Sequence, residues 1–203
     1  MFRVFPTAKD DGYEIGQSLN IDYGKYLNRQ NTVSTDGRKF TFSFWIKPAS
    51  TETYHDAAFF SRGVSGSNFT DLVLSKSLGK IYFQEYGTSN EMRFDGEMPW
   101  TPDFAAWQHI VMRYDSTEVV DTDRLKIFIN GVKRDITFWA TPALNWESLI
   151  FSSMGYINNG GSNMTINGAV NLSSDLYWSD YNFIDGQSPG PEMFALEDSK
   201  GVY

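Results

Sequence analysis

Polar and apolar side chains alternate along residues 38–48, which read R-K-F-T-F-S-F-W-I-K-P. One set of alternating positions is wholly apolar: Phe40, Phe42, Phe44 and Ile46. The positions between them are more polar: Thr41, Ser43, Trp45 and Lys47. Because successive side chains of a strand point to opposite faces, this pattern predicts a half-buried strand over residues 38–47. Pro48 cannot donate a backbone hydrogen bond, so we expect the strand to end there.

A second alternating region begins at Trp107 and predicts a pair of strands joined by a polar loop. Residues 107–115 read W-Q-H-I-V-M-R-Y-D, and residues 124–132 read R-L-K-I-F-I-N-G-V. Asn130-Gly131 favours a type I′ turn, because both residues tolerate a positive φ. We therefore expect residues 132–138 to complete a hairpin. The residues expected in the core are Phe42, Phe44, Ile127 and Ile129.

The remaining chain predicts about a dozen short strands and no helix longer than about ten residues. Residues 24–37 are polar and predict a loop, and Asp95-Gly96 predicts a turn. The fold class is therefore all-β, a β-sandwich or a jelly roll. We expect one domain over residues 1–203, with an N-terminal arm at 1–14 and a C-terminal tail at 186–203.

Composition narrows the function classes. Aromatic residues make up 16% of the 203 residues, which is ample material for a core. The net charge of −8 disfavours binding to nucleic acid and to anionic lipid. The chain has no cysteine, so neither disulfides nor thiolate metal sites can support the fold. We also expect no signal peptide and no membrane insertion, because no apolar run is long enough.

Three segments in this order resemble a known family: F-T-F-S-F-W-I-K, W-Q-H-I-V-M-R-Y-D and R-L-K-I-F-I-N-G-V. They are similar to the laminin G and pentraxin-like branch of the concanavalin A-like lectin/glucanase superfamily. The end of the chain has D-L-Y-W-S-D-Y-N-F-I-D-G-Q, then P-E-M-F and G-V-Y. This ending resembles laminin G-like domains in virion proteins of tailed bacteriophages and algal viruses. The resemblance covers roughly residues 15 to 203.

The resemblance implies a β-sandwich of two antiparallel sheets in the concanavalin A-like jelly-roll topology. It also implies a non-catalytic structural protein of the virion, made in the host cytoplasm. It would form part of a tail fibre, neck or head decoration. Its partners would be other virion structural proteins, host-surface glycans and further copies of itself in a homo-oligomer. Two alternatives remain open, a free carbohydrate-binding lectin and a glycoside hydrolase or lyase.

Carboxylates and histidines are the candidates for catalysis. Glu91, Asp95 and Glu97 have strand spacing, and paired carboxylates can cleave glycosides. The predicted turn at Asp95-Gly96 would separate them, and the compact E-x-D-x-x-E pattern of the glucanases is absent from the sequence. His109 lies in a predicted strand, away from His55, which favours a structural role. We therefore expect no catalytic residues.

Calcium is the metal that the resemblance raises, since many domains of this kind hold it with loop carboxylates. The candidate ligands in the loop before the hairpin are Asp115, Asp121 and Asp123. Polar turns are the ordinary explanation for such a loop. No other cofactor is expected.

Aromatic residues in predicted loops are candidates for glycan stacking: Tyr54, Trp100, Trp139, Trp146 and Tyr156. The same rings could instead pack into the core or anchor a protein interface. An apolar segment after the hairpin is the candidate interface between copies: Phe138, Trp139, Leu144 and Trp146.

Overall fold

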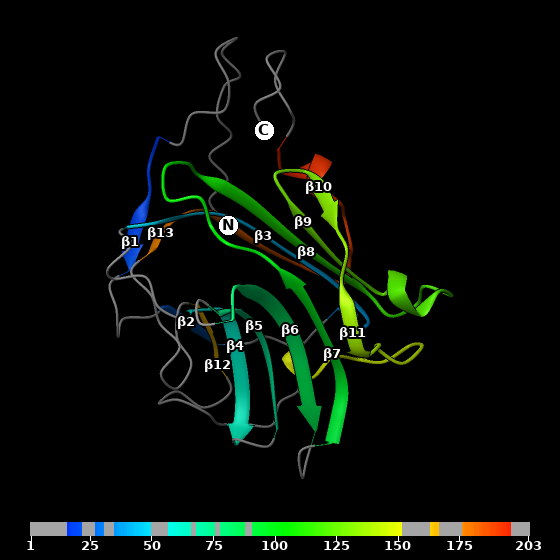
Figure 1. Ribbon diagram of the computed structural model, residues 1–203. Helices are drawn as coiled ribbons and strands as arrows, with labels where there is room; N and C mark the ends of the chain where they lie inside the picture. Colours follow the sequence, from blue (N-terminus) through cyan, green and yellow to red (C-terminus); the bar gives the residue numbers. More distant parts are fainter. Residues whose placement is uncertain are drawn as a thin grey trace.

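The computed structural model describes residues 16–21, 27–30, 35–49, 57–65, 68–75, 78–87, 91–151, 163–166 and 176–195. Two antiparallel sheets face each other in these ranges (Figure 1). Three short 3-10 turns accompany them: η2 (Asp121–Asp123), η3 (Leu149–Phe151) and η4 (Pro191–Met193). None of the helical turns in these ranges is long and apolar enough to cross a membrane. The all-β, two-sheet sandwich is confirmed.

The first sheet has six strands in the order β1-β13-β3-β8-β9-β10. Their bounds are β1 (Leu19–Ile21), β13 (Leu176–Asp185), β3 (Lys39–Pro48), β8 (Gln108–Asp115), β9 (Leu125–Ile129) and β10 (Val132–Arg134). The strongly alternating segments of the sequence thus lie at its centre.

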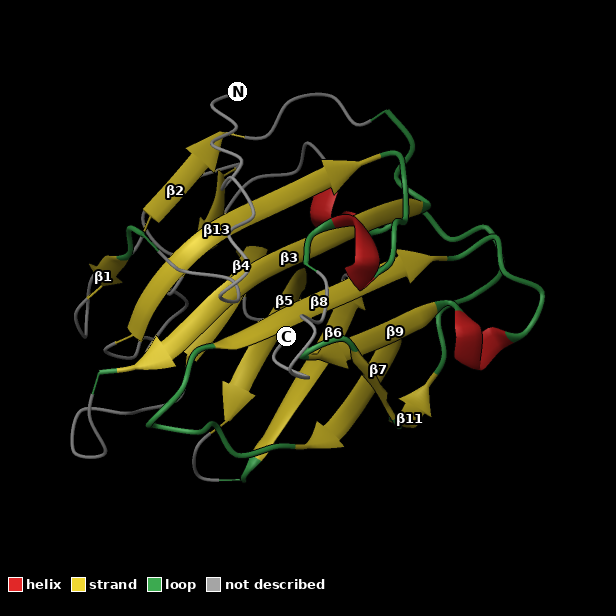
Figure 2. Ribbon diagram, turned by 90° about the horizontal axis from the view of Figure 1, so that it is seen from above, coloured by secondary structure: helices red, strands yellow, loops and turns green. Residues whose placement is uncertain are grey.

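The second sheet has seven strands in the order β11-β7-β6-β5-β4-β12-β2. Their bounds are β11 (Thr137–Ala140), β7 (Glu91–Pro99), β6 (Lys80–Gly87), β5 (Asn68–Ser75), β4 (Ala57–Ser65), β12 (Asn163–Ile166) and β2 (Leu27–Gln30). Seen from above, the strands of the first sheet cross over those of the second (Figure 2).

Aromatic rings from both sheets fill the space between them. The ring of Phe42 stacks on that of Phe60 with centroids 4.0 Å apart, which joins β3 to β4 across the core. Phe44 also packs against Phe59 across the core, with tilted rings whose centroids are 5.1 Å apart. The four residues expected in the core are almost fully buried: Phe42, Phe44, Ile127 and Ile129. That prediction is confirmed.

The strand β3 is buried on both faces, so the prediction of a half-buried strand was wrong. The segment after β13 lies over the outer face of the first sheet and ends in η4 (Figure 1). Thr41 Oγ1 donates to the carbonyl oxygen of Pro189 at 3.1 Å. Arg113 Nε donates to that of Ser188 at 2.7 Å. Thr41, on the polar side of the strand, therefore meets this tail rather than water.

The turn of the hairpin is as predicted, but its second strand is shorter. Asn130 and Gly131 have φ values of 49° and 74°, which fit a type I′ turn. The strand β10 ends at Arg134, and the chain then enters the other sheet as β11. Residues 132–138 are therefore not one strand. The change of sheet buries Phe138 against the core, which a longer β10 would not do.

Two predicted breaks are strands instead. Asp95-Gly96 lies within β7, which pairs with β6 on both sides of it. Gly96 is needed there for packing, since a Cβ atom on it would lie 3.0 Å from Cε1 of Phe138. The predicted loop at 24–37 contains β2, which pairs with β12.

Candidate functional site

The outward side chains of β6, β7 and β11 form the candidate site, which we call the open face. In β6, alternate residues such as Phe83 point into the core, and the residues between them are half-exposed. The register extends the same face onto the two neighbouring strands. Its members are Lys80, Tyr82, Gln84, Tyr86, Met92, Asp95, Glu97 and Trp139.

A polar row crosses the open face at its middle. Asp71 of β5 pairs in register with Gln84, and Gln84 pairs with Asp95. Neighbouring strands are about 4.8 Å apart, so the three side chains lie side by side. Tyr86 Oη donates to Asp95 Oδ2 at 3.4 Å. Carboxylate and amide groups in a row can bind several hydroxyl groups of one ligand.

Asp71 ends the row beneath the surface. Asp71 is only 6% exposed, and its Oδ1 atom has no hydrogen-bond partner in the described part of the chain. Burial raises the pKa of Asp71 to about 7, against the opposing effect of a hydrogen bond from Gln84. Asp71 is therefore much harder to ionise than an aspartate in water.

Asp95 and Glu97 differ in their surroundings although they share one strand face. Burial raises the pKa of Asp95, and the charge of Glu97 raises it further, while the hydrogen bond from Tyr86 lowers it. Glu97 forms an ion pair with Lys80 Nζ. The prediction that a turn separates these two carboxylates was wrong, because β7 is continuous through them.

Trp139 is the exposed aromatic residue of the open face. A bulge in β11 places Trp139 and Ala140 together opposite Asp95. Phe138 before it packs inward, and the Trp139 side chain points outward with the residue 72% exposed. A flat ring beside a carboxylate suits a sugar, which has apolar faces and hydroxyl edges.

Trp100 and Trp146 do not join this face, and the burial of Trp100 contradicts its assignment to glycan stacking. Trp100 is 8% exposed and belongs to the core. Trp146 packs against the core, stacks with Arg93 at 4.9 Å and donates from Nε1 to Glu85 Oε1 at 2.6 Å. Tyr54 and Tyr156 lie outside the described residues.

Glu85 is an inward carboxylate that the sequence reading missed. Besides Trp146, three groups donate to its Oε2: Thr70 Oγ1 at 2.9 Å, Ser148 Oγ at 2.6 Å and Leu149 N at 2.8 Å. Burial raises the pKa of Glu85, and these hydrogen bonds lower it. Glu85 therefore attaches the segment after β11 to β6.

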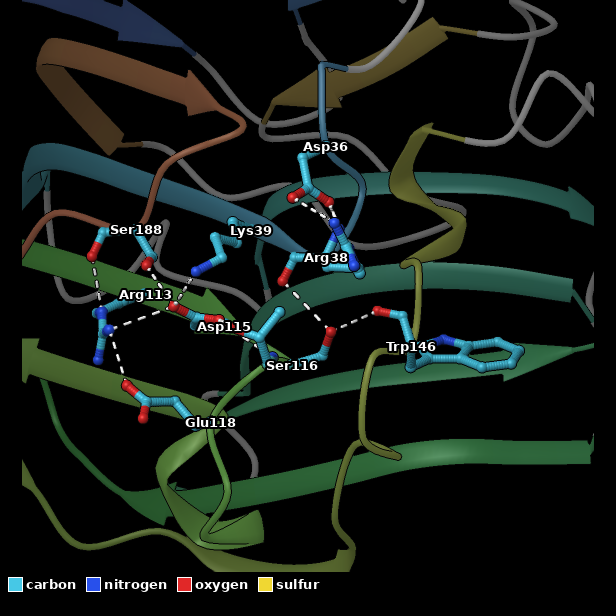
Figure 3. A network of polar contacts seen from close by, with 10 residues as sticks. Asp36, Arg38, Lys39, Arg113, Asp115, Ser116, Glu118, Trp146 and Ser188 are labelled. Carbon is cyan, nitrogen blue, oxygen red and sulfur yellow. Dashed lines mark hydrogen bonds and ion pairs between the residues drawn. The ribbon is translucent and has the colours of Figure 1, made fainter.

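The three aspartates proposed for calcium are committed to other contacts. Asp115 Oδ2 accepts from Lys39 Nζ at 3.2 Å and Ser188 Oγ at 2.8 Å, as Figure 3 shows. Asp123 Oδ1 pairs with Lys126 at 3.1 Å, and Asp121 Oδ2 accepts from Thr141 Oγ1.

These contacts also favour the ionised form of Asp115. Burial raises its pKa, but the hydrogen bonds outweigh burial, so the pKa lies below its usual value. Within the described ranges, no group of three His, Cys, Asp or Glu side chains could hold a metal ion. The structure therefore does not bring Asp115, Asp121 and Asp123 together as one group of ligands.

His109 has the structural role expected of it. Its Nε2 lies 2.8 Å from Ser43 Oγ, and its ring stacks on Trp45 at 4.8 Å. Burial lowers the pKa of His109 to about 4, so the ring is neutral at physiological pH. His55 lies outside the described residues.

The proposed interface segment divides into buried and exposed residues. Phe138 and Trp146 are partly buried and pack against the core, whereas Trp139 and Leu144 are exposed. Leu144 belongs to a second surface, which we call the loop end.

The loop end is formed by loops 116–123 and 141–147. Arg124 joins these loops by donating to the carbonyl oxygens of Glu118 at 2.9 Å and Pro142 at 2.7 Å. Its exposed apolar residues are Val119, Val120 and Leu144.

Most members of the open face were missed by sequence reading. The signal was present, because K-I-Y-F-Q-E-Y-G alternates between inward and outward positions over β6. Glu85 obscured it, since a charged residue at an inward position breaks the expected pattern of polar residues outside.

Comparison with known proteins agrees with this architecture. Residues 22–171 match the family described as the concanavalin A-like lectin/glucanases superfamily. No curated protein matches the chain.

Among solved structures, the botulinum neurotoxin serotype G binding domain is 14% identical, with a TM-score of 0.55. The match covers 90% of this chain and 42% of that one, so the chain spans less than half of its length. Domain 4 of AbnA, a GH43 extracellular arabinanase from Geobacillus stearothermophilus in complex with arabinotriose, is 13% identical with a TM-score of 0.55. That match covers 88% of this chain and 75% of that one.

The Ruminococcus gnavus IT-sialidase CBM40, bound to alpha2,3 sialyllactose, is 10% identical with a TM-score of 0.52. The match covers 91% of this chain and 94% of the CBM40 chain. At these identities the three structures share the fold with this chain.

Proposed function

Because the chain belongs to the concanavalin A-like lectin/glucanases superfamily, we propose that it is a non-catalytic module whose open face binds a glycan. One observation carries this proposal: Trp139 is 72% exposed and lies across a bulge from Asp95 on an exposed sheet face. The ring supplies an apolar platform, and the polar row supplies hydrogen bonds. Two structures of this fold contain oligosaccharides, arabinotriose and sialyllactose, so glycans are a reasonable ligand class to test.

A glycan array with the full chain tests the proposal. We expect wild type to bind at least one glycan, and Trp139→Ala to weaken that binding by about tenfold or more. Val132→Ala is the matched control, because Val132 is also exposed but lies on β10, in the other sheet. Equal binding by wild type and Trp139→Ala would exclude the open face as the site.

The finer part of the proposal is that this module belongs to a virion appendage, where it assists assembly and attachment to host-surface glycans. Its support is the resemblance in sequence. Part of that resemblance lies in β13, where Leu176 and Trp178 are buried. Core packing accounts for this part. Mass spectrometry of purified particles of the encoding virus would detect the chain as a component. Its absence from particles would favour a free lectin.

We propose further that copies of the chain associate with each other through the loop end and form a closed oligomer. Other virion proteins would be additional partners. Val119 is 88% exposed and Leu144 is 55% exposed, and Arg124 holds their loops together. Exposed apolar groups on a rigid frame suit a protein interface.

Glycoside hydrolysis is the second candidate, and Asp95 with Glu97 favours it. Residues two apart on one strand face are about 7 Å apart, within the range of glycosidase carboxylates. Against it, Lys80 already pairs with Glu97, the residue that would attack or activate water. We expect no release of reducing ends from β-glucans. Release that disappears in Glu97→Gln would replace binding by hydrolysis as the function.

A further inference from the structure

We infer that the open face selects uncharged glycans and rejects anionic ones. This inference rests on the proposed function, since it assigns the ligand class of the same site. Three features determine this selectivity: the charges that the face presents, the ion pair that already neutralises some of them, and the position of the aromatic ring.

The face and its buried end contain three carboxylates, Asp71, Asp95 and Glu97. Among its described members, Lys80 is the basic residue, and its ammonium group is paired with Glu97. Arg93 also lies on β7, but its guanidinium stacks on the ring of Trp146, which donates to the inward carboxylate of Glu85. The described part of the face therefore offers no uncommitted cation to a carboxylate or sulfate of a ligand.

The hydrogen-bonding groups of the row complement hydroxyl groups. An ionised carboxylate only accepts hydrogen bonds, and a sugar hydroxyl can donate one. Asp95 has one described donor, Tyr86 Oη at 3.4 Å, and so retains acceptor capacity toward solvent. Asp71 Oδ1 is buried at the other end of the row, so Asp95 is the acceptor that a ligand on the surface can meet. A hydroxyl donor of a ligand would satisfy the exposed lone pairs of Asp95, whereas an anionic substituent brings only further acceptors.

Trp139 determines the position of a charged group on a bound ligand. Since the bulge places Trp139 opposite Asp95, a sugar ring stacked on the indole lies beside that carboxylate. Two like charges about 5 Å apart near a protein surface repel each other strongly enough to weaken binding by about tenfold or more. The net charge of −8 acts in the same direction at longer range.

Matched pairs on a glycan array provide the test: uncharged oligosaccharides, such as lactose and N-acetyllactosamine, beside their sialylated and sulfated forms. We expect the uncharged member of a bound pair to be preferred by about tenfold or more. The double variant Asp95→Asn with Glu97→Gln should reduce that preference to within about threefold. Asp121→Asn, which removes a negative charge outside the face, should leave the preference unchanged.

The outcomes separate the inference from the function on which it rests. Equal or tighter binding of the anionic members, lost in Trp139→Ala, would overturn the selectivity and retain the glycan site. A preference for uncharged members that survives in the double variant would overturn the role of the carboxylates. Binding to no glycan would overturn both. Thermal unfolding of each variant near the wild-type temperature shows that the comparison concerns folded protein.

Discussion

At the scale of single residues, two buried carboxylates in this sandwich differ in how they are solvated. Glu85 accepts four hydrogen bonds in the core, from Thr70, Trp146, Ser148 and Leu149. The hydrogen bond that lowers the pKa of Asp71 comes from Gln84. Its Oδ1 atom has no hydrogen-bond partner in the described residues. Burying a charge without enough partners is unfavourable, so Asp71 destabilises the fold when it ionises, whereas Glu85 joins two elements.

Replacing Asp71 by Asn should therefore stabilise the protein in a pH-dependent way. The folded pKa is about 7 and the ordinary value is 3.8, so between them the folded state binds more protons than the unfolded state. Wild type then loses about 1.4 kcal/mol of stability per pH unit, or about 4 kcal/mol in all. Relative to wild type, Asp71→Asn should gain stability from about pH 4 to about pH 7 and remain level above. Urea unfolding of both proteins across this range measures the difference, and a constant difference would contradict the assignment.

Glu85→Ala should strongly destabilise the sandwich. It leaves four donors without an acceptor in a buried position, and each unpaired group costs about 1–3 kcal/mol. We expect a loss of at least about 3 kcal/mol in the free energy of unfolding, measured in urea. Glu97→Gln is the control, because that carboxylate is partly exposed and its ion pair should contribute only about 0–1 kcal/mol. Similar losses in the two variants would show that the four hydrogen bonds contribute little.

At the scale of elements, the alternation of polar and apolar residues predicted those strands whose position depends on their own sequence. The strand β3 and the turn at Asn130-Gly131 followed from alternation and from positive φ. The strand β11 did not follow, because its place depends on Gly96 of another strand, which leaves room for Phe138. Asp95, Glu97 and Trp139 were named from the sequence, but not as one face, since only the register between β6, β7 and β11 brings them together.

The hairpin turn gives a prediction at this scale. Gly131 has a φ of 74°, so Gly131→Ala forces a side chain into the left-handed region. We expect a loss of about 1 kcal/mol and a fall of about 2–4 °C in the unfolding temperature, followed by circular dichroism. Asn130→Gly is the control, because glycine accepts the φ of 49° at that position. That variant should unfold within about 1 °C of wild type. A Gly131→Ala protein as stable as wild type would mean that the turn is not type I′.

At the scale of the whole molecule, the two outer sheet faces differ in how much of them can meet a ligand. The segment after β13 lies over the first sheet, where Thr41 and Arg113 donate to it. The second sheet presents the open face toward its β11 edge. The loop end is a separate surface, built by the loops before and after the hairpin and joined by Arg124. Two different partners can therefore be held by one rigid sandwich.

This separation predicts that ligand binding and self-association can be removed independently. Trp139→Ser should weaken glycan binding by about tenfold or more and leave the molar mass in solution unchanged, because Trp139 lies on the open face. The pair Val119→Ser with Leu144→Ser should lower the molar mass at micromolar concentration without changing glycan affinity, because both residues lie on the loop end. Multi-angle light scattering and a glycan array on the same preparations measure the two properties. A Trp139→Ser protein that dissociates would place the interface between copies on the open face. Wild type that is monomeric at every concentration would remove the loop end as a contact between copies and leave it for a different virion protein.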